Sequence, residues 1–214
     1  MLLGLENSDP LFQRALRLQH HSAPSSRSRT ESYQLHGLLR SGALAEAEEL
    51  LRKHEQLNLP GLAGGFTFFY RVDLDRRAGR QTDDVRLQED TRCYTQAFAL
   101  LAAARQTGRS SHDAAILCDR SIAMLTQMIA HGAANADLTE GRNLLNLIRS
   151  GGALYRASVT NDECEWHAAA GAARDHISGL PSGAQTWFAK AMSHFPDGCN
   201  TASAEAFLDR LPYL

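Results

Sequence analysis

The stretch of sequence that decides the fold is GGFTFFYRVDLD, residues 64–75. Apolar side chains occupy every second position from residue 66 onward, and polar side chains lie between them, except at Phe69. A period of two that is rich in aromatic and β-branched residues is typical of a β-strand. Residues 76–80 supply a turn and residues 84–87 a short return strand, so the sequence predicts a β-hairpin at residues 65–87.

On both sides of this segment, apolar residues recur with the period of an α-helix. The predicted helices are residues 11–21, 31–40, 44–57, 89–107, 111–131, 138–149, 161–177, 185–194 and 202–211. Glycines follow several of them, and the pair Gly151-Gly152 is expected to end the helix that begins at residue 138. Because short connections join consecutive helices, we expect antiparallel helical hairpins.

The N-terminal region differs from the rest in composition. Residues 22–29 are rich in serine and arginine, contain Pro24 and lack an apolar period, so we expect a loop there. The sequence therefore predicts an N-terminal part, residues 1–30, that consists of a short helix and this loop. Residues 31–214 are expected to form a single helical domain, which is long enough to bury a substantial core.

Composition and charge exclude several classes of protein. The net charge is −2, and no basic stripe indicates nucleic-acid binding. No apolar run is long enough to cross a bilayer. The opening residues MLLGL are followed at once by Glu6 and Asp9, unlike a secretory signal, so we expect a cytoplasmic protein that does not bind membranes. Four widely spaced cysteines without a C-x-x-C pair predict no metal site, and no cofactor is expected.

Several motifs occur in a fixed order around the predicted hairpin: Gly64-Gly65-Phe66, then Val72-Asp73-Leu74-Asp75, Gly79, Thr91-Arg92, and Tyr94-Thr95-Gln96-Ala97-Phe98-Ala99-Leu100. This order resembles the sugar 2-epimerase and isomerase family, which includes N-acylglucosamine 2-epimerase, cellobiose 2-epimerase and mannose isomerase. The resemblance covers residues 44–132. It implies an (α/α)6 barrel, here shortened to a partial α/α toroid, with a small sugar in a central cleft. It also implies proton transfer at C2 by an active-site base.

Candidate site residues follow from the sequence and from the resemblance. Glu163 and His167 are four positions apart, so they share a helix face and are candidates for the catalytic acid–base pair. A surface ion pair near a helix N-terminus is the alternative for these two residues. Gln96 corresponds to a site position of the family, two residues after Tyr94.

Three further residues complete the predicted sugar-binding set. Arg71 points away from the apolar face of the predicted strand, toward a cleft in a barrel or toward water in a plain hairpin. Tyr94 and Trp166 are candidates to stack on a sugar ring, although single aromatic residues at helical spacing are more often part of the core.

Two other functions remain open from the sequence. A helical domain of this size suits the heme-oxygenase-like fold, whose members bind heme, thiamine fragments or di-iron. The third possibility is a non-catalytic helical interaction module, an effector or adaptor that binds a protein partner. The Ser/Arg-rich N-terminal region and the incomplete catalytic set favour this third possibility.

Overall fold

The computed structural model describes residues 24–57, 61–83, 87, 94–132, 139–180, 182–183, 185–186, 188 and 198–211. The described part of the chain forms helices and their connections and contains no strand. The helices are α2 (Pro24–Ser41), α3 (Leu44–Gln56), α4 (Gly61–Arg77), α6 (Tyr94–Ala104), α7 (Ser111–Gly132), α8 (Thr139–Thr160), α9 (Glu163–Ser178) and α11 (Thr201–Leu208).

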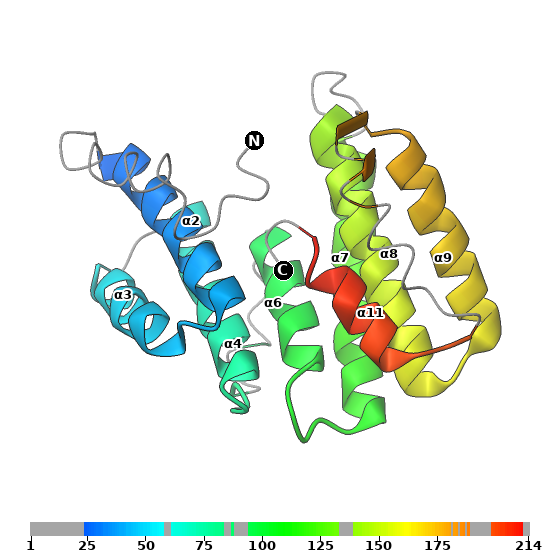
Figure 1. Ribbon diagram of the computed structural model, residues 1–214, viewed down its shortest axis with the longest axis horizontal. Helices are drawn as coiled ribbons and strands as arrows, with labels where there is room; N and C mark the ends of the chain where they lie inside the picture. Colours follow the sequence, from blue (N-terminus) through cyan, green and yellow to red (C-terminus); the bar gives the residue numbers. More distant parts are fainter. Residues whose placement is uncertain are drawn as a thin grey trace.

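The described helices are packed largely in chain order. Figure 1 shows α2 and α3 at one side of the molecule, α6 in the middle and α9 at the opposite side. α7, α8 and α9 pack as successive neighbours, and α11 returns along the chain to pack on α8. The all-α class and the helical hairpins are therefore confirmed. The described helices form an open row in this view, rather than the toroid predicted from the sequence.

The predicted β-hairpin is wrong, because residues 61–77 form the helix α4. Phe69, Tyr70, Val72 and Leu74 are all buried, although they lie on different sides of the helix. α4 packs against α2, α3 and α6, so several of its sides are covered and its apolar residues show no simple helical stripe. Of the predicted return strand, the structure describes only Leu87, which is helical.

The predicted loop in the N-terminal region is also corrected. α2 begins at Pro24 and includes most of the Ser/Arg-rich segment. Proline is well suited to the first position of a helix, because the N–H that it lacks would have no partner within the helix. The predicted helix at residues 11–21 lies outside the described residues.

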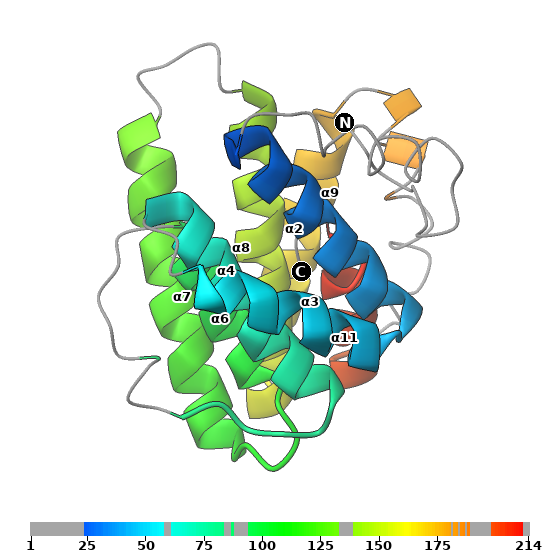
Figure 2. The same ribbon diagram turned by 90° about the vertical axis from the view of Figure 1, so that its left-hand side faces the viewer.

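The core is centred on α6. Every residue from Thr95 to Ala104 is buried, so α6 is covered on all sides rather than on one face. α4 and α7 pack against it, and Figure 2 shows α2 and α3 covering α4 on the outside. None of the helices that the structure describes combines the length and the hydropathy that crossing a bilayer requires.

The pair Gly151-Gly152 does not end a helix, contrary to the prediction. Both residues lie inside α8, which continues to Thr160. A Cβ atom at Gly152 would lie 3.0 Å from Leu101 Cδ2 of α6, and one at Gly151 would lie 2.5 Å from Leu208 Cδ2 of α11. Gly151 therefore allows α11 to approach α8 closely, and Gly152 leaves room for the Leu101 side chain of α6.

The remaining helix predictions agree with the structure, with shifted ends. The ranges 44–57, 111–131 and 161–177 correspond to α3, α7 and α9, whereas α6 and α11 are shorter than predicted. α9 begins after Asp162, whose side chain accepts a hydrogen bond from the Glu165 amide. Most of the predicted helix at residues 185–194 lies outside the described residues.

Candidate functional site

Arg71 holds α4 against α3. Its Nε and Nη2 donate hydrogen bonds to the two carboxylate oxygens of Glu55 at 2.8 and 2.9 Å, and its Nη1 donates to Glu48 at 2.9 and 3.0 Å. The hydrogen bonds to Glu55, and to a smaller extent those to Glu48, raise the pKa of Arg71 above its ordinary value. Burial lowers this pKa, but by less than the hydrogen bonds raise it. Arg71 is therefore occupied by two carboxylates of the neighbouring helix.

Tyr94 and Gln96 lie in the packed interface around α6. The Tyr94 ring is 5.8 Å from the Phe66 ring of α4 and 5.5 Å from the Phe98 ring, measured between centroids. Gln96 is 4 % exposed, and its side-chain amide donates to the Leu87 carbonyl at 3.3 Å. Both side chains thus make contacts that stabilise the interior.

The three candidate residues of α9 fall into two environments. Trp166 is 1 % exposed and belongs to the core. The Glu163 and His167 side chains lie on the surface, 55 % and 67 % exposed, with Glu163 Oε2 3.8 Å from His167 Nε2. Glu163 also accepts a hydrogen bond from the Cys199 amide at 3.3 Å, which joins the start of α9 to the segment before α11.

The structure does not bring the six candidate residues together. Arg71 lies between α4 and α3, whereas Glu163 and His167 lie on α9, at the opposite side of the row (Figure 1). Gln96 and Tyr94 are on the central helix α6. The Gly-Gly-aromatic hairpin on which the sugar-epimerase resemblance depends is part of a helix here. Sugar binding and catalysis by these residues stay predictions from the sequence.

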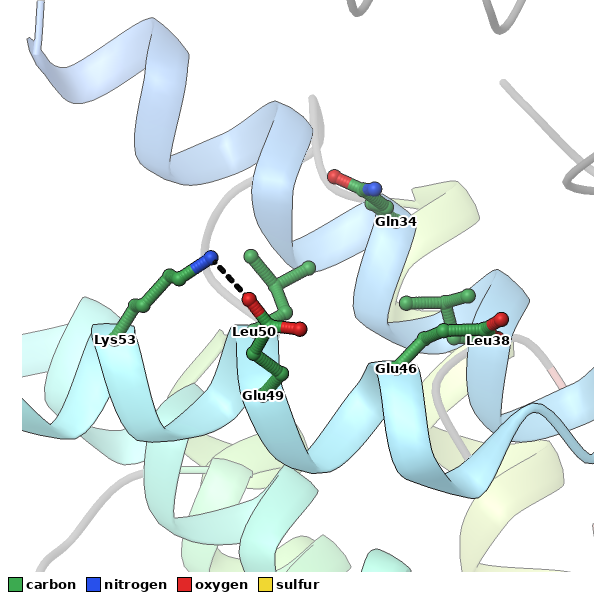
Figure 3. Close-up of a pocket in the computed structure, with 6 residues that line it drawn as sticks. All are labelled: Gln34, Leu38, Glu46, Glu49, Leu50 and Lys53. Carbon is green, nitrogen blue, oxygen red and sulfur yellow. Dashed lines mark hydrogen bonds and ion pairs between the residues drawn. The ribbon is translucent and has the colours of Figure 1, made fainter.

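A surface groove lies elsewhere, between α2 and α3 (Figure 3). It has a volume of about 330 Å³ and is lined by Gln34 and Leu38 of α2 and by Glu46, Glu49, Leu50 and Lys53 of α3. In Figure 3 the two helices diverge along the groove, and the side chains of both helices lie along it. This groove combines two leucines with charged side chains in one solvent-facing depression.

The charges of the groove lie on α3. Lys53 Nζ is 2.7 Å from Glu49 Oε1, with both side chains well exposed. The hydrogen bond from Lys53 lowers the pKa of Glu49 below its ordinary value, so Glu49 is ionised at neutral pH. Glu46 is exposed one turn earlier on the same helix. Two carboxylates and one ammonium group give the groove a negative surplus.

A buried polar pair fixes the spacing of the two helices that form the groove. His54 Nε2 of α3 lies 2.8 Å from Glu31 Oε2 of α2, and the two side chains are only 3 % and 15 % exposed. Leu35 and Leu38 of α2 and Leu51 of α3 are buried in the core, and α2 packs against α3. Because these contacts hold α2 against α3, the groove is a preformed surface rather than a gap between loosely placed helices.

Sequence reasoning missed the groove. Leu50 is an apolar residue of α3, but its side chain is only half-buried. One sequence pattern does mark the α3 side of the groove, because Glu46, Leu50 and Lys53 recur at helical spacing and so share one face. Leu57 continues this pattern, and the structure leaves it 60 % exposed. The contribution of α2 has no such signal, because it depends on how the two helices pack.

The groove differs in its chemistry from the metal-ligating and thiol side chains of the described residues. Within the described ranges, no group of three or more histidine, cysteine, aspartate or glutamate side chains is placed to hold a metal ion. Burial raises the pKa of Cys118 to about 12, which makes its thiol unreactive. The groove between α2 and α3 instead offers apolar side chains beside charges, a combination suited to noncovalent recognition.

Comparisons with known proteins gave no match: no protein-family model, no curated protein and no solved structure is similar to this chain at a significant level.

Proposed function

We propose that this protein is a non-catalytic helical interaction module, and that the groove between α2 and α3 is its docking surface. The observation that carries the proposal is the groove itself, in which Leu38 and Leu50 lie beside Glu46 and Glu49 on a rigid helical hairpin. An open row of helices supports it further, because helices stacked in series present extended surfaces to partners.

The partner is a basic amphipathic segment of another protein. Its apolar side chains pack against the half-buried Leu50 and the exposed Leu57 at the end of α3, above the buried Leu38. Its lysine or arginine side chains meet the carboxylates of Glu46 and Glu49, which outnumber the single lysine of the groove. This follows the helix-in-groove mode of peptide recognition, with apolar anchors in the groove and charge complementarity at the rim.

Fluorescence anisotropy with labelled peptides tests this proposal. A helix-forming peptide of leucine and lysine should bind saturably, whereas a peptide with glutamate in place of lysine should not. We expect the double variant Glu46→Lys, Glu49→Lys to bind the basic peptide at least about tenfold more weakly, which corresponds to about 1.4 kcal/mol. Both residues are exposed, so these substitutions preserve the fold.

Asp175→Lys is the matched control, because it reverses an exposed carboxylate on α9, away from the groove. It should leave the affinity for the basic peptide within about twofold. Equal affinity of the charge-reversed groove variant and the original protein, or tighter binding of the acidic peptide, would show that the groove is not the docking surface for a basic partner.

The sugar-epimerase prediction is tested separately. Incubation of the protein with mannose, glucose, N-acetylmannosamine or cellobiose in deuterated water should give no deuterium at C2, because the candidate residues do not converge on one site. Deuterium incorporation that disappears in the variant His167→Gln would contradict the non-catalytic proposal.

A further inference from the structure

A second charged feature lies where α2, α4, the end of α6 and the end of α11 meet. We call it the arginine cluster: Arg40, Arg76, Arg77 and Arg105 around Asp73 and Asp209. It is distinct from the α2–α3 groove, with which it shares no residue. It also contains none of the six candidate site residues that were selected from the sequence.

Asp73 and Asp209 organise the cluster. Asp73 Oδ1 accepts from Arg76 Nε at 2.8 Å, and its Oδ2 accepts from Arg77 Nε at 2.9 Å. Asp209 Oδ1 accepts from Arg76 Nη2 at 3.3 Å and makes a shorter contact with Arg105 Nη2. The same oxygen lies 3.8 Å from Arg77 Nη2. One carboxylate oxygen thus faces three guanidinium groups.

The cluster carries more positive than negative charge. Its four guanidinium groups surround the two carboxylates of Asp73 and Asp209, so these six side chains have a surplus of two positive charges. Glu205 near Arg76 and Arg210 near Arg40 add one more distant charge of each sign. Burial together with neighbouring arginines lowers the pKa of both Arg40 and Arg105, as expected where like charges are crowded.

The deep end of the cluster contains an unsatisfied donor. The Arg105 side chain is 1 % exposed, and within the described part of the chain its Nε has no hydrogen-bond partner. Leaving a buried donor unpaired costs about 1–3 kcal/mol. At the outer end, Arg40 is exposed and the Asp209 side chain is 42 % exposed, so the cluster reaches the surface.

We propose that the arginine cluster binds a phosphate group, supplied either as free phosphate or as a phosphate monoester. A dianionic oxyanion neutralises the surplus of two charges, and guanidinium groups recognise its oxygens by paired N–H donors. The four guanidinium groups carry many more N–H donors than the two central carboxylates accept, so donors remain for the ligand. Arg40 and Arg77 form the accessible side of this site.

Isothermal titration calorimetry of the full chain tests the proposal, with inorganic phosphate and O-phosphoserine as probes at constant ionic strength. Saturable binding of both probes indicates a monoester ligand, and saturable binding of phosphate alone indicates the free anion; either result supports the proposal. A phosphate-dependent rise in Tm of about 3 °C at tenfold excess over Kd should accompany it. Sodium chloride at equal ionic strength should not produce this rise.

Variants locate the site. Arg40→Gln and Arg77→Gln should each weaken phosphate binding at least tenfold, whereas Arg80→Gln should leave it unchanged. Arg80 is half-exposed, follows α4 in the chain and pairs with Glu48 and Asp75, outside the cluster. No binding by the unaltered protein, or the same loss in Arg80→Gln as in Arg77→Gln, would overturn the proposal. The measurement on the unaltered protein keeps the test decisive if a variant fails to fold.

Discussion

Leu208 occupies the space that a side chain at Gly151 would need. A Cβ atom on Gly151 would lie 2.5 Å from Leu208 Cδ2 and 3.3 Å from Leu208 Cγ, and a third contact, with Leu211 Cδ1, would also be 3.3 Å. Both leucines are fully buried, so they have little room to move. The absence of a side chain at Gly151 therefore determines how closely α11 packs on α8.

We expect Gly151→Ala to lower the free energy of unfolding by about 1–3 kcal/mol, because the added methyl group overpacks the interface between α8 and α11. The measurement is urea denaturation followed by circular dichroism. The matched control is Gly171→Ala in α9, where a Cβ atom would meet nothing within 4 Å. That substitution should stabilise the protein by up to about 1 kcal/mol, since alanine favours a helix over glycine. Equal effects of both substitutions would contradict the close packing of α8 on α11.

These glycines illustrate what the sequence could and could not predict. α3, α7 and α9 were predictable, because amphipathic periodicity marks all three locally and polar residues, Ser110 and Asp162, precede α7 and α9. The pair Gly151-Gly152 has two possible meanings, a helix end or a close contact between helices. Only the position of Leu208, more than fifty residues further along the chain, decides between them.

The β-hairpin was predicted wrongly for a related reason. Phe66, Phe68, Tyr70, Val72 and Leu74 do alternate with polar residues, but neighbouring helices cover α4 on several sides. Tertiary packing then overrides the local strand preference of aromatic and β-branched residues. The groove and the arginine cluster were equally beyond prediction, because each joins residues from helices that are separate in the sequence.

Arg71 should contribute measurably to stability, because it is largely buried and binds two carboxylates of α3. We expect Arg71→Gln to lower the free energy of unfolding by about 1–2 kcal/mol in low salt, and by less in 1 M sodium chloride. Chemical denaturation at both salt concentrations measures this. Lys53→Gln removes a well-exposed ion pair and should leave the stability almost unchanged. If both substitutions have equal effects, Arg71 does not act as the clamp between α3 and α4.

His36 should make the protein sensitive to mild acid. Its pKa is lowered from 6.5 to about 4, mainly by burial and next by the positive charge of Arg40. The charge of Arg77 lowers this pKa further, whereas the carboxylate of Asp73 raises it. Since a guanidinium group only donates, the contact of Arg40 Nη1 with His36 Nε2 at 3.5 Å makes this nitrogen an acceptor. The folded protein therefore keeps His36 neutral at pH values where the unfolded chain protonates it.

The stabilising effect of the neutral His36 is complete above pH 6.5 and is lost as the pH falls toward 4. Within this window, the free energy of unfolding should fall with decreasing pH more steeply in the original protein than in His36→Gln. The difference in slope should approach about 1 kcal/mol per pH unit. His112→Gln, which replaces an exposed histidine of α7, is the control. Parallel pH profiles for the original protein and His36→Gln would contradict the lowered pKa of His36.

A two-dimensional 15N–1H NMR titration with the basic amphipathic peptide locates the docking surface residue by residue. If the peptide binds between α2 and α3, the largest amide shifts fall on Gln34, Leu38, Glu46, Glu49, Leu50 and Lys53, and α8 and α9 change little. Shifts concentrated on α8 or α9, or no shifts at peptide concentrations well above that of the protein, would contradict binding between α2 and α3.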